Sequence, residues 1–246
     1  MTTRRRITPR NRAAFTACRR ILKLVRAIRQ RSSRRASRNG GTVDLLLDKT
    51  DKTARAVILL GSRGYAEDSL VLARSLANLA IDVSYLKKED ADRFVSYRAV
   101  GREARRRMAE QCGCSPPDAA ATDWDDVKAR AKRWQRGGSL HERAKKANRL
   151  RLYEYAYRHG SSFEHSDAWS LLTYEPGNAA FRDVVLHLSL LIAAYALVGG
   201  YQSWCLFFGI EDNPTDDAIK KCFMAAFPGT ERGATGPLGE STAEPR

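Results

Sequence analysis

An uncharged segment from Val184 to Ile210 constrains the fold of this chain more than any other feature. The segment contains no Asp, Glu, Lys or Arg, and about 20 apolar residues suffice for a helix to cross a bilayer. It predicts either a transmembrane helix or the central helix of a bundle, because a helix that is apolar on every side must be covered. His187, Gln202 and the Gly199-Gly200 pair favour the bundle. The glycine pair is expected to divide the segment into two shorter pieces.

Helical periodicity runs through most of the remaining chain. Leu72, Leu76, Leu79 and Val83 recur at spacings of four and three, which predicts a core helix over 66–86. Further helices are expected at 42–60, 90–111, 123–135, 140–158 and 168–174, separated by Gly or Pro breaks. No alternating pattern typical of strands occurs. The sequence therefore predicts an all-α bundle of about six or seven helices over 42–227, followed by a disordered tail over 228–246.

Positive charge is concentrated before the Gly40-Gly41 pair, which is expected to act as a hinge. The net charge is +15, and residues 1–39 contain 14 Lys or Arg and no acid, which leaves 29 basic and 28 acidic residues in the rest. Residues 1–41 are therefore a predicted basic arm, either disordered or folding into an amphipathic helix on a polyanion or an anionic membrane. Such an arm binds nucleic acid through phosphate, without reading sequence and with strong salt dependence. The candidate phosphate-binding residues are Arg4, Arg5, Arg6, Arg19, Arg20, Arg34 and Arg35.

The basic arm and the cysteines bear on the localisation of the protein and on whether it binds a metal. The arm lacks the apolar core of a secretory signal, although an Arg-rich, acid-free segment is also typical of an organellar transit peptide. The five cysteines show no framework spacing, which favours a reducing cytoplasm. Cys112 and Cys114 stand only one residue apart, whereas zinc sites usually space their thiolates more widely and need a second pair. We expect no metal and no cofactor. The alternative localisation is a single-pass membrane protein with its N-terminal side cytoplasmic.

Three polar residues follow one face of the predicted helix over 66–86. Arg74, Asn78 and Asp82 recur every four residues, so they lie on one side of the helix. A guanidinium inside a bundle is costly without a partner, so Arg74 should contact one of the other two or a group on another helix. This line is either a structural network or a polar pocket whose arginine binds an anionic group such as phosphate.

The stretch Tyr153 to Trp169 ends a predicted helix in a polar corner. Arg158 and His165 are six residues apart there, a spacing that resembles the Arg-His motif of the HEPN ribonucleases. That resemblance implies a metal-independent ribonuclease at a helical dimer interface, where His moves protons and Arg stabilises the phosphate charge. The pairs Arg136/His141 and Arg182/His187 fit the same spacing, so the motif does not select one site.

A longer resemblance covers about residues 64–169. The residues that carry it are Arg74-Ser75-Leu76, Tyr85, Arg93-Phe94, Tyr97, Tyr157, Ser162 and His165. Together they resemble the bacterial all-helical family known as domain of unknown function 5677. The resemblance implies helical architecture, a shared Arg/His pocket and, by analogy alone, an association with phage defence or mobile elements. Asn78 departs from the family, which usually has Glu at this position.

Two functional hypotheses follow from these observations. The first is a cytoplasmic helical protein that binds nucleic acid through its arm and acts as a metal-independent ribonuclease or phage-defence effector, with a homodimer as its expected assembly. Its candidate catalytic residues are Arg74, Arg158 and His165, and its candidate pocket residues are Asn78, Asp82, Tyr157 and Ser162. The alternative is a non-enzymatic helical protein, attached to a membrane through residues 184–210, in which the same pocket is structural.

Overall fold

The computed structural model describes residues 7–32, 38–86, 90–115, 122–164, 178–211 and 213–228 of the chain. Every regular element in these ranges is a helix, which confirms the predicted all-α class. The described residues form nine helices, against the six or seven expected: α1 (Pro9–Ser32), α2 (Arg38–Ser62), α3 (Ala66–Tyr85), α4 (Ala91–Gln111), α5 (Trp124–Arg136), α6 (Leu140–Lys146), α7 (Leu150–Glu164), α9 (Ala179–Phe208) and α10 (Asn213–Ala226). The expected segment at 168–174 and the tail over 229–246 lie outside the described residues.

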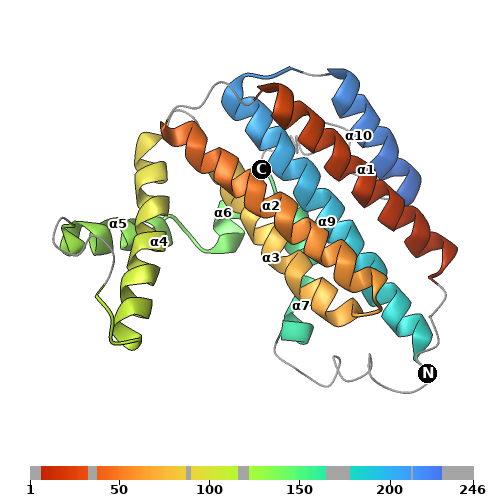
Figure 1. Cartoon of the computed structure of the whole chain (residues 1–246), viewed down its shortest axis with the longest axis horizontal. Coiled ribbons are helices and arrows are strands. Elements are labelled where there is room, and N and C mark those ends of the chain that lie inside the picture. Colours follow the sequence, from red (N-terminus) through yellow and green to blue (C-terminus); the bar gives the residue numbers. More distant parts are fainter. Residues whose placement is uncertain are drawn as a thin grey trace, which may run out of the picture.

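Helix α9 forms the centre of the bundle, with α1, α2, α3 and α7 packed around it (Figure 1). Among the described helices it is the one long and apolar enough to cross a membrane, and 83% of its apolar window is buried inside the protein. Leu190, Ile192 and Leu197 are fully buried. Each side chain of this size contributes about 1.5–3 kcal/mol on full burial. The uncharged segment therefore supplies a large part of the apolar core.

Gly199 and Gly200 lie inside α9 without dividing it, contrary to expectation. A Cβ atom on Gly199 would lie 3.1 Å from Arg149 Nε. Arg149 enters the bundle at this point and donates to Ser84 Oγ at 3.1 Å and to the Gly199 carbonyl at 3.4 Å. Burial lowers the pKa of its guanidinium. The glycine is thus explained by the space that this arginine needs, and the helix passes through unbroken because packing on all sides stabilises it.

Residues 9–32 were expected to form part of a separate arm, but they form helix α1, which packs in the bundle. The amphipathic helix is present, and its apolar face packs against α9 and α10 (Figure 1). Phe15, Ile21, Val25 and Ile28 are each at most 4% exposed. The bundle therefore begins at α1 rather than at residue 42. The Gly40-Gly41 pair lies within α2 and is no hinge.

Ion pairs hold α1 against α2. Arg26 donates to both carboxylate oxygens of Asp51, at 2.7 and 2.8 Å, and Arg29 donates to Asp48 at 3.1 Å. Burial of Asp51 opposes its ionisation, but the bonds from Arg26 and then Arg55 outweigh burial and lower its pKa. Part of the positive charge assigned to the arm is therefore neutralised inside the fold.

The expected single helix over 140–158 is two helices, α6 and α7. Asn148 adopts a φ of 55° between them, a left-handed conformation that Asn tolerates better than most residues. The Arg149 amide then donates to the Ala144 carbonyl at 2.7 Å, which closes the end of α6. This break turns α7 onto α3 and carries Arg149 into the core.

Helices α4 and α5 pack on each other as a lobe that projects from the bundle (Figure 1). A small separate core of Ala99, Val127 and Ala131 holds them together. Trp134 of α5 joins the lobe to the bundle, since its ring lies edge-on to Tyr85 of α3 with centroids 5.4 Å apart. The side chains of Asp90 and Asp123 accept backbone hydrogen bonds at the starts of the two helices, and these caps explain why both began within a residue of the expected position.

Candidate functional site

Arg74, Asn78 and Tyr157 meet in a polar cluster between α3 and α7. The Tyr157 hydroxyl donates to Asn78 Oδ1 at 3.0 Å. The guanidinium carbon of Arg74 lies 4.2 Å from the centroid of the Tyr157 ring, a cation–π contact worth about 0.5–1 kcal/mol at a partly exposed site. The predicted polar line therefore finds a partner on another helix. Asn78 accepts the hydrogen bond of the phenol through its amide oxygen, a role that the carboxylate of Glu would also fill.

An aromatic strip, made of His141, Tyr153 and Tyr157, extends this cluster from α7 to α6. Tyr153 stacks on Tyr157 with centroids 4.5 Å apart and an interplanar angle of 16°. The ring of His141 meets Tyr153 edge-on at 5.1 Å. His141 is exposed, and its Nδ1 lies 3.4 Å from Glu142 Oε1. Arg74 thus contacts one end of the strip, and an exposed imidazole forms the other.

Asp82 does not join the cluster of Arg74. It accepts a hydrogen bond from Arg143 Nε at 3.0 Å, and Arg143 also lies over the Trp134 ring at 5.2 Å. Burial raises the pKa of Asp82, against the opposing effect of Arg143. Burial, and then the charge of Asp82, raise the pKa of Tyr97 to about 12. Asp82 therefore belongs to the joint between the bundle and the α4–α5 lobe.

Three predicted site residues lie outside what the structure describes. His165 falls in the undescribed range 165–177, and the side chains of Arg158 and Ser162 are not described within α7. Whether an imidazole shares a pocket with Arg74 therefore stays a prediction. What the structure does place is the helix that carries Arg158, with Tyr157 directly before it in contact with Arg74.

The other two Arg-His spacings occupy different environments. Arg136 ends α5 and His141 lies in α6, so this pair spans the exposed turn between the two helices. His187 lies on the buried side of α9 at 8% exposure, and its Nδ1 has no hydrogen-bond partner among the described residues. Burial, with a smaller effect of Arg10, lowers the pKa of His187 to about 4. A neutral, enclosed imidazole of this kind is poorly suited to exchange protons with a substrate.

The turn between α5 and α6 gathers four exposed cations, which we call the α5–α6 corner. It consists of Arg133, Arg136, Lys145 and Lys146. Lys146 Nζ donates to the Gly137 carbonyl at 3.1 Å, which brings the end of α6 to the end of α5. No ion pair involves any of the four cations within the described part of the chain. Their charges are thus available to an external anion.

The sequence prediction did not include the α5–α6 corner, because the net charge was taken over all residues after 39. Residues 90–151 contain 16 Lys or Arg and nine Asp or Glu, whereas the whole chain after residue 39 is nearly neutral. A shorter window would have shown the excess. Several of these acids are already engaged by cations of the lobe, as when Arg130 donates to Asp126 at 2.6 Å, so they do not pair with the four cations of the corner.

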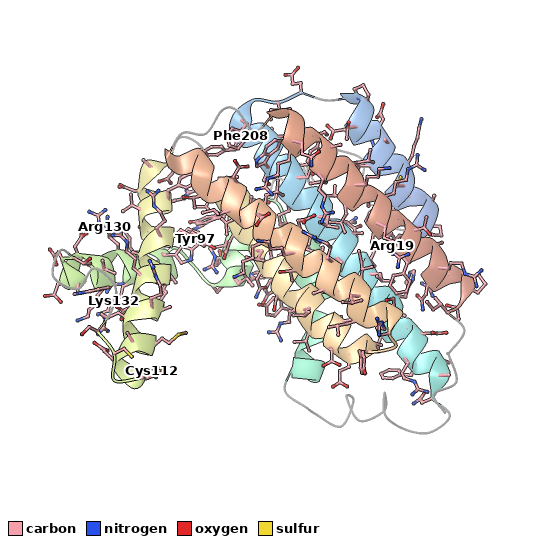
Figure 2. The ribbon with its side chains drawn as sticks, viewed as in Figure 1. Arg19, Tyr97, Cys112, Arg130, Lys132 and Phe208 are labelled. Atoms are coloured by element: carbon pink, nitrogen blue, oxygen red, sulfur yellow. The ribbon has the colours of Figure 1, made fainter. Side chains whose placement is uncertain are left out.

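The candidate phosphate-binding residues of the arm separate into two groups. Arg19 and Arg20 are exposed on α1, on the side of the molecule away from the α4–α5 lobe, as Figure 2 shows for Arg19. Arg12 and Lys23 extend this face of the helix, because residues four or so apart share one side. Outside the described residues lie Arg4, Arg5, Arg6, Arg34 and Arg35.

The comparison with known families bears on residues 45–175. Over this range the chain matches the model of a family whose description reads "Family of unknown function (DUF5677)". The comparisons with curated proteins and with solved structures gave no match. The matched range covers more than half of the chain and includes the Arg74 cluster, the joint at Asp82 and the α5–α6 corner. The HEPN resemblance finds no corresponding match. The chain therefore belongs to the DUF5677 family, a family of unknown function.

Proposed function

We propose that the protein binds the phosphate groups of nucleic acid, chiefly at the α5–α6 corner. The observation that carries this proposal is the set of four exposed cations around one turn, none of which is paired with an acid in the described residues. Lys and Arg displace condensed counterions when they contact phosphate, which supplies affinity without sequence readout. Glu142, the acid of α6, contacts His141 rather than these cations.

The apolar faces of the basic helices α1 and α5 are already buried inside the protein, which favours nucleic acid over an anionic membrane as the partner. A helix that binds a bilayer surface inserts an apolar face between the headgroups. The apolar face of α5 is used against α4, where Val127 and Ala131 are buried. The apolar face of α1 is used against the bundle, as at Ile21 and Val25. Both helices therefore offer cations without an apolar face beside them.

The test is a salt titration of binding to a fluorescently labelled single-stranded RNA and to a DNA duplex. For four phosphate contacts, log K should fall against log salt with a slope of about −3 on single strands and about −4 on duplex DNA. The variant Arg133→Gln/Arg136→Gln/Lys145→Gln/Lys146→Gln should lose most of this slope, since each phosphate contact accounts for about one unit. Lys49→Gln, an exposed lysine on α2, is the control and should change neither slope nor affinity. Equal slopes for the fourfold variant and the wild type would reject the proposal.

Cations of α1 provide a second contact surface that must be tested by substitution. Deleting residues 1–39 would remove α1 and uncover α9, so the loss of binding would be confused with the loss of the fold. Arg19→Gln/Arg20→Gln leaves the buried face intact, because both side chains are exposed. A smaller loss of slope than in the corner variant is expected, since only two cations are removed.

Cleavage of RNA is a second proposed function, and one observation favours it. Arg74 stacks on Tyr157, the residue that precedes Arg158 on the helix leading toward His165. A guanidinium held there can stabilise charge on a phosphate while an imidazole moves protons. In purified protein, His165→Ala should abolish cleavage of a labelled RNA and leave its binding unchanged. Cleavage that persists in this variant would exclude His165 as the catalytic base.

A further inference from the structure

Two of the five cysteines lie at the exposed end of the α4–α5 lobe. Cys112 and Cys114 are exposed free thiols, whereas Cys18, Cys205 and Cys222 are buried. Figure 2 shows Cys112 at the far end of α4, away from the bundle. The pair has no part in the bundle core or in the α5–α6 corner, and nothing in the proposed nucleic-acid contacts uses it.

The backbone turn at the end of α4 brings the two cysteines together. Helix α4 ends at Gln111, and Gly113 takes a φ of 67°, in the left-handed region that favours glycine. The Cys114 amide then donates to the Ala109 carbonyl at 2.8 Å, which folds the chain back over the helix end. Cys114 Sγ lies 3.6 Å from the carbonyl oxygen of Cys112 and donates to it. Both thiols are therefore held at one end of the helix.

A third sulfur lies one helical turn before Cys112. Met108 is 64% exposed, one of the few large apolar side chains left in solvent among the described residues. Residues four apart on a helix are neighbours on the same face, so the thioether of Met108 and the thiol of Cys112 project from one side of α4. The end of the lobe thus presents two thiols and a thioether with no packing role.

We propose that Met108, Cys112 and Cys114 form a binding site for a soft monovalent cation of the Cu(I) type. Thiolates and thioethers are soft ligands that favour Cu(I), zinc and iron–sulfur clusters over the harder metal ions. Cu(I) is satisfied by a low coordination number, which two thiolates and one thioether supply. Zinc needs a fuller set, and no group of three His, Cys, Asp or Glu that could hold a metal occurs among the described residues. On binding, each cysteine thiol gives up its proton and the sulfur donates a lone pair to the metal.

The test is an anaerobic titration of the fully reduced chain with Cu(I) against a coloured Cu(I) chelator. We expect one Cu(I) per chain to be withheld from the chelator, with release of protons to the buffer. Cys112→Ser and Cys114→Ser should each abolish this retention, and Met108→Leu should weaken it. Ser115→Ala in the same turn and Met224→Leu in α10 are matched controls and should retain the metal as the wild type does.

Far-ultraviolet circular dichroism of each variant shows whether it is folded, and these exposed positions are expected to tolerate substitution. Copper–sulfur distances from X-ray absorption on the loaded protein should show sulfur as the sole ligand type. Retention of Cu(I) by the Cys112→Ser/Cys114→Ser double variant would overturn the proposal, because the metal would then be held elsewhere. Complete transfer of Cu(I) from the wild type to the chelator would overturn it equally. Neither outcome bears on the binding of RNA at the α5–α6 corner.

Discussion

The buried imidazole of His187 makes the stability of the bundle depend on pH in a defined window. Its ring lies between α9 and the end of α10, with the Phe227 ring 5.4 Å away and Nδ1 without a hydrogen-bond partner among the described residues. Burial lowers the pKa of His187 from 6.5 to about 4, and the nearby positive charge of Arg10 acts in the same direction. The unfolded chain therefore binds a proton at a higher pH than the folded chain does.

The sign and size of the effect follow from proton linkage. Where the unfolded state binds more protons, stability rises with pH. As the pH is lowered, the loss of stability therefore begins near pH 6.5 and levels off below about pH 4. At pH 5 the difference in proton binding corresponds to a loss of about 2 kcal/mol relative to pH 7.5. Above pH 7 the imidazole is neutral in both states and contributes no pH dependence.

Urea unfolding of the wild type and of His187→Leu at pH 7.5, 6 and 5 measures this loss. The leucine variant should keep about 2 kcal/mol more of its stability at pH 5 than the wild type keeps. At pH 7.5 we expect it to be at least as stable as the wild type, because it removes a buried polar atom that lacks a partner, at a cost of about 1–3 kcal/mol. His141→Gln, at an exposed ring, is the control and should follow the wild type. Equal losses for the wild type and His187→Leu between pH 7.5 and pH 5 would refute the reasoning.

Two further predictions concern the arginines that enter the bundle. Gly199→Ala places a Cβ 3.1 Å from Arg149 Nε and should destabilise the protein by about 1–3 kcal/mol in thermal unfolding. A Cβ on Gly200 would have its nearest neighbour 3.7 Å away, so Gly200→Ala should be neutral or stabilising. An equal response of the two glycines would contradict the role of Arg149. Asp82→Asn leaves Arg143 without its carboxylate and should cost about 3 kcal/mol, seen as a lower urea midpoint and as faster hydrogen exchange in α6; unchanged exchange there would show that the pair does not anchor α6.

The polar cluster shows how far a site could be derived from spacing. The spacing of four residues between Arg74, Asn78 and Asp82 correctly placed three polar groups on one face of α3, because helical geometry alone determines which residues share a face. It did not determine which group each would meet. Tyr157 comes to Arg74 because α7 packs on α3, and Arg143 takes Asp82 because the break at Asn148 separates α6 from α7.

The basic arm shows the opposite case, in which a correct local pattern led to an incorrect placement. The apolar residues of α1 predicted an amphipathic helix, and the helix is there. Charge composition then suggested that it stood apart from the bundle. The acids that neutralise Arg26 and Arg29 are Asp51 and Asp48 of α2, and sequence distance gave no sign that those side chains would face α1.

Sequence alone determined the helical class, the helix boundaries near Asp90 and Asp123, and the need to cover the segment from Val184 to Ile210 by either a bundle or a membrane. These properties follow from the period of apolar residues, from local capping and from the absence of charge between Val184 and Ile210, all of which act over short stretches of chain. Tertiary structure alone decided that α1 belongs to the bundle and that Gly199 makes room for Arg149. Each of these depends on which helix faces turn toward one another, and that choice is made by burial summed over the whole chain.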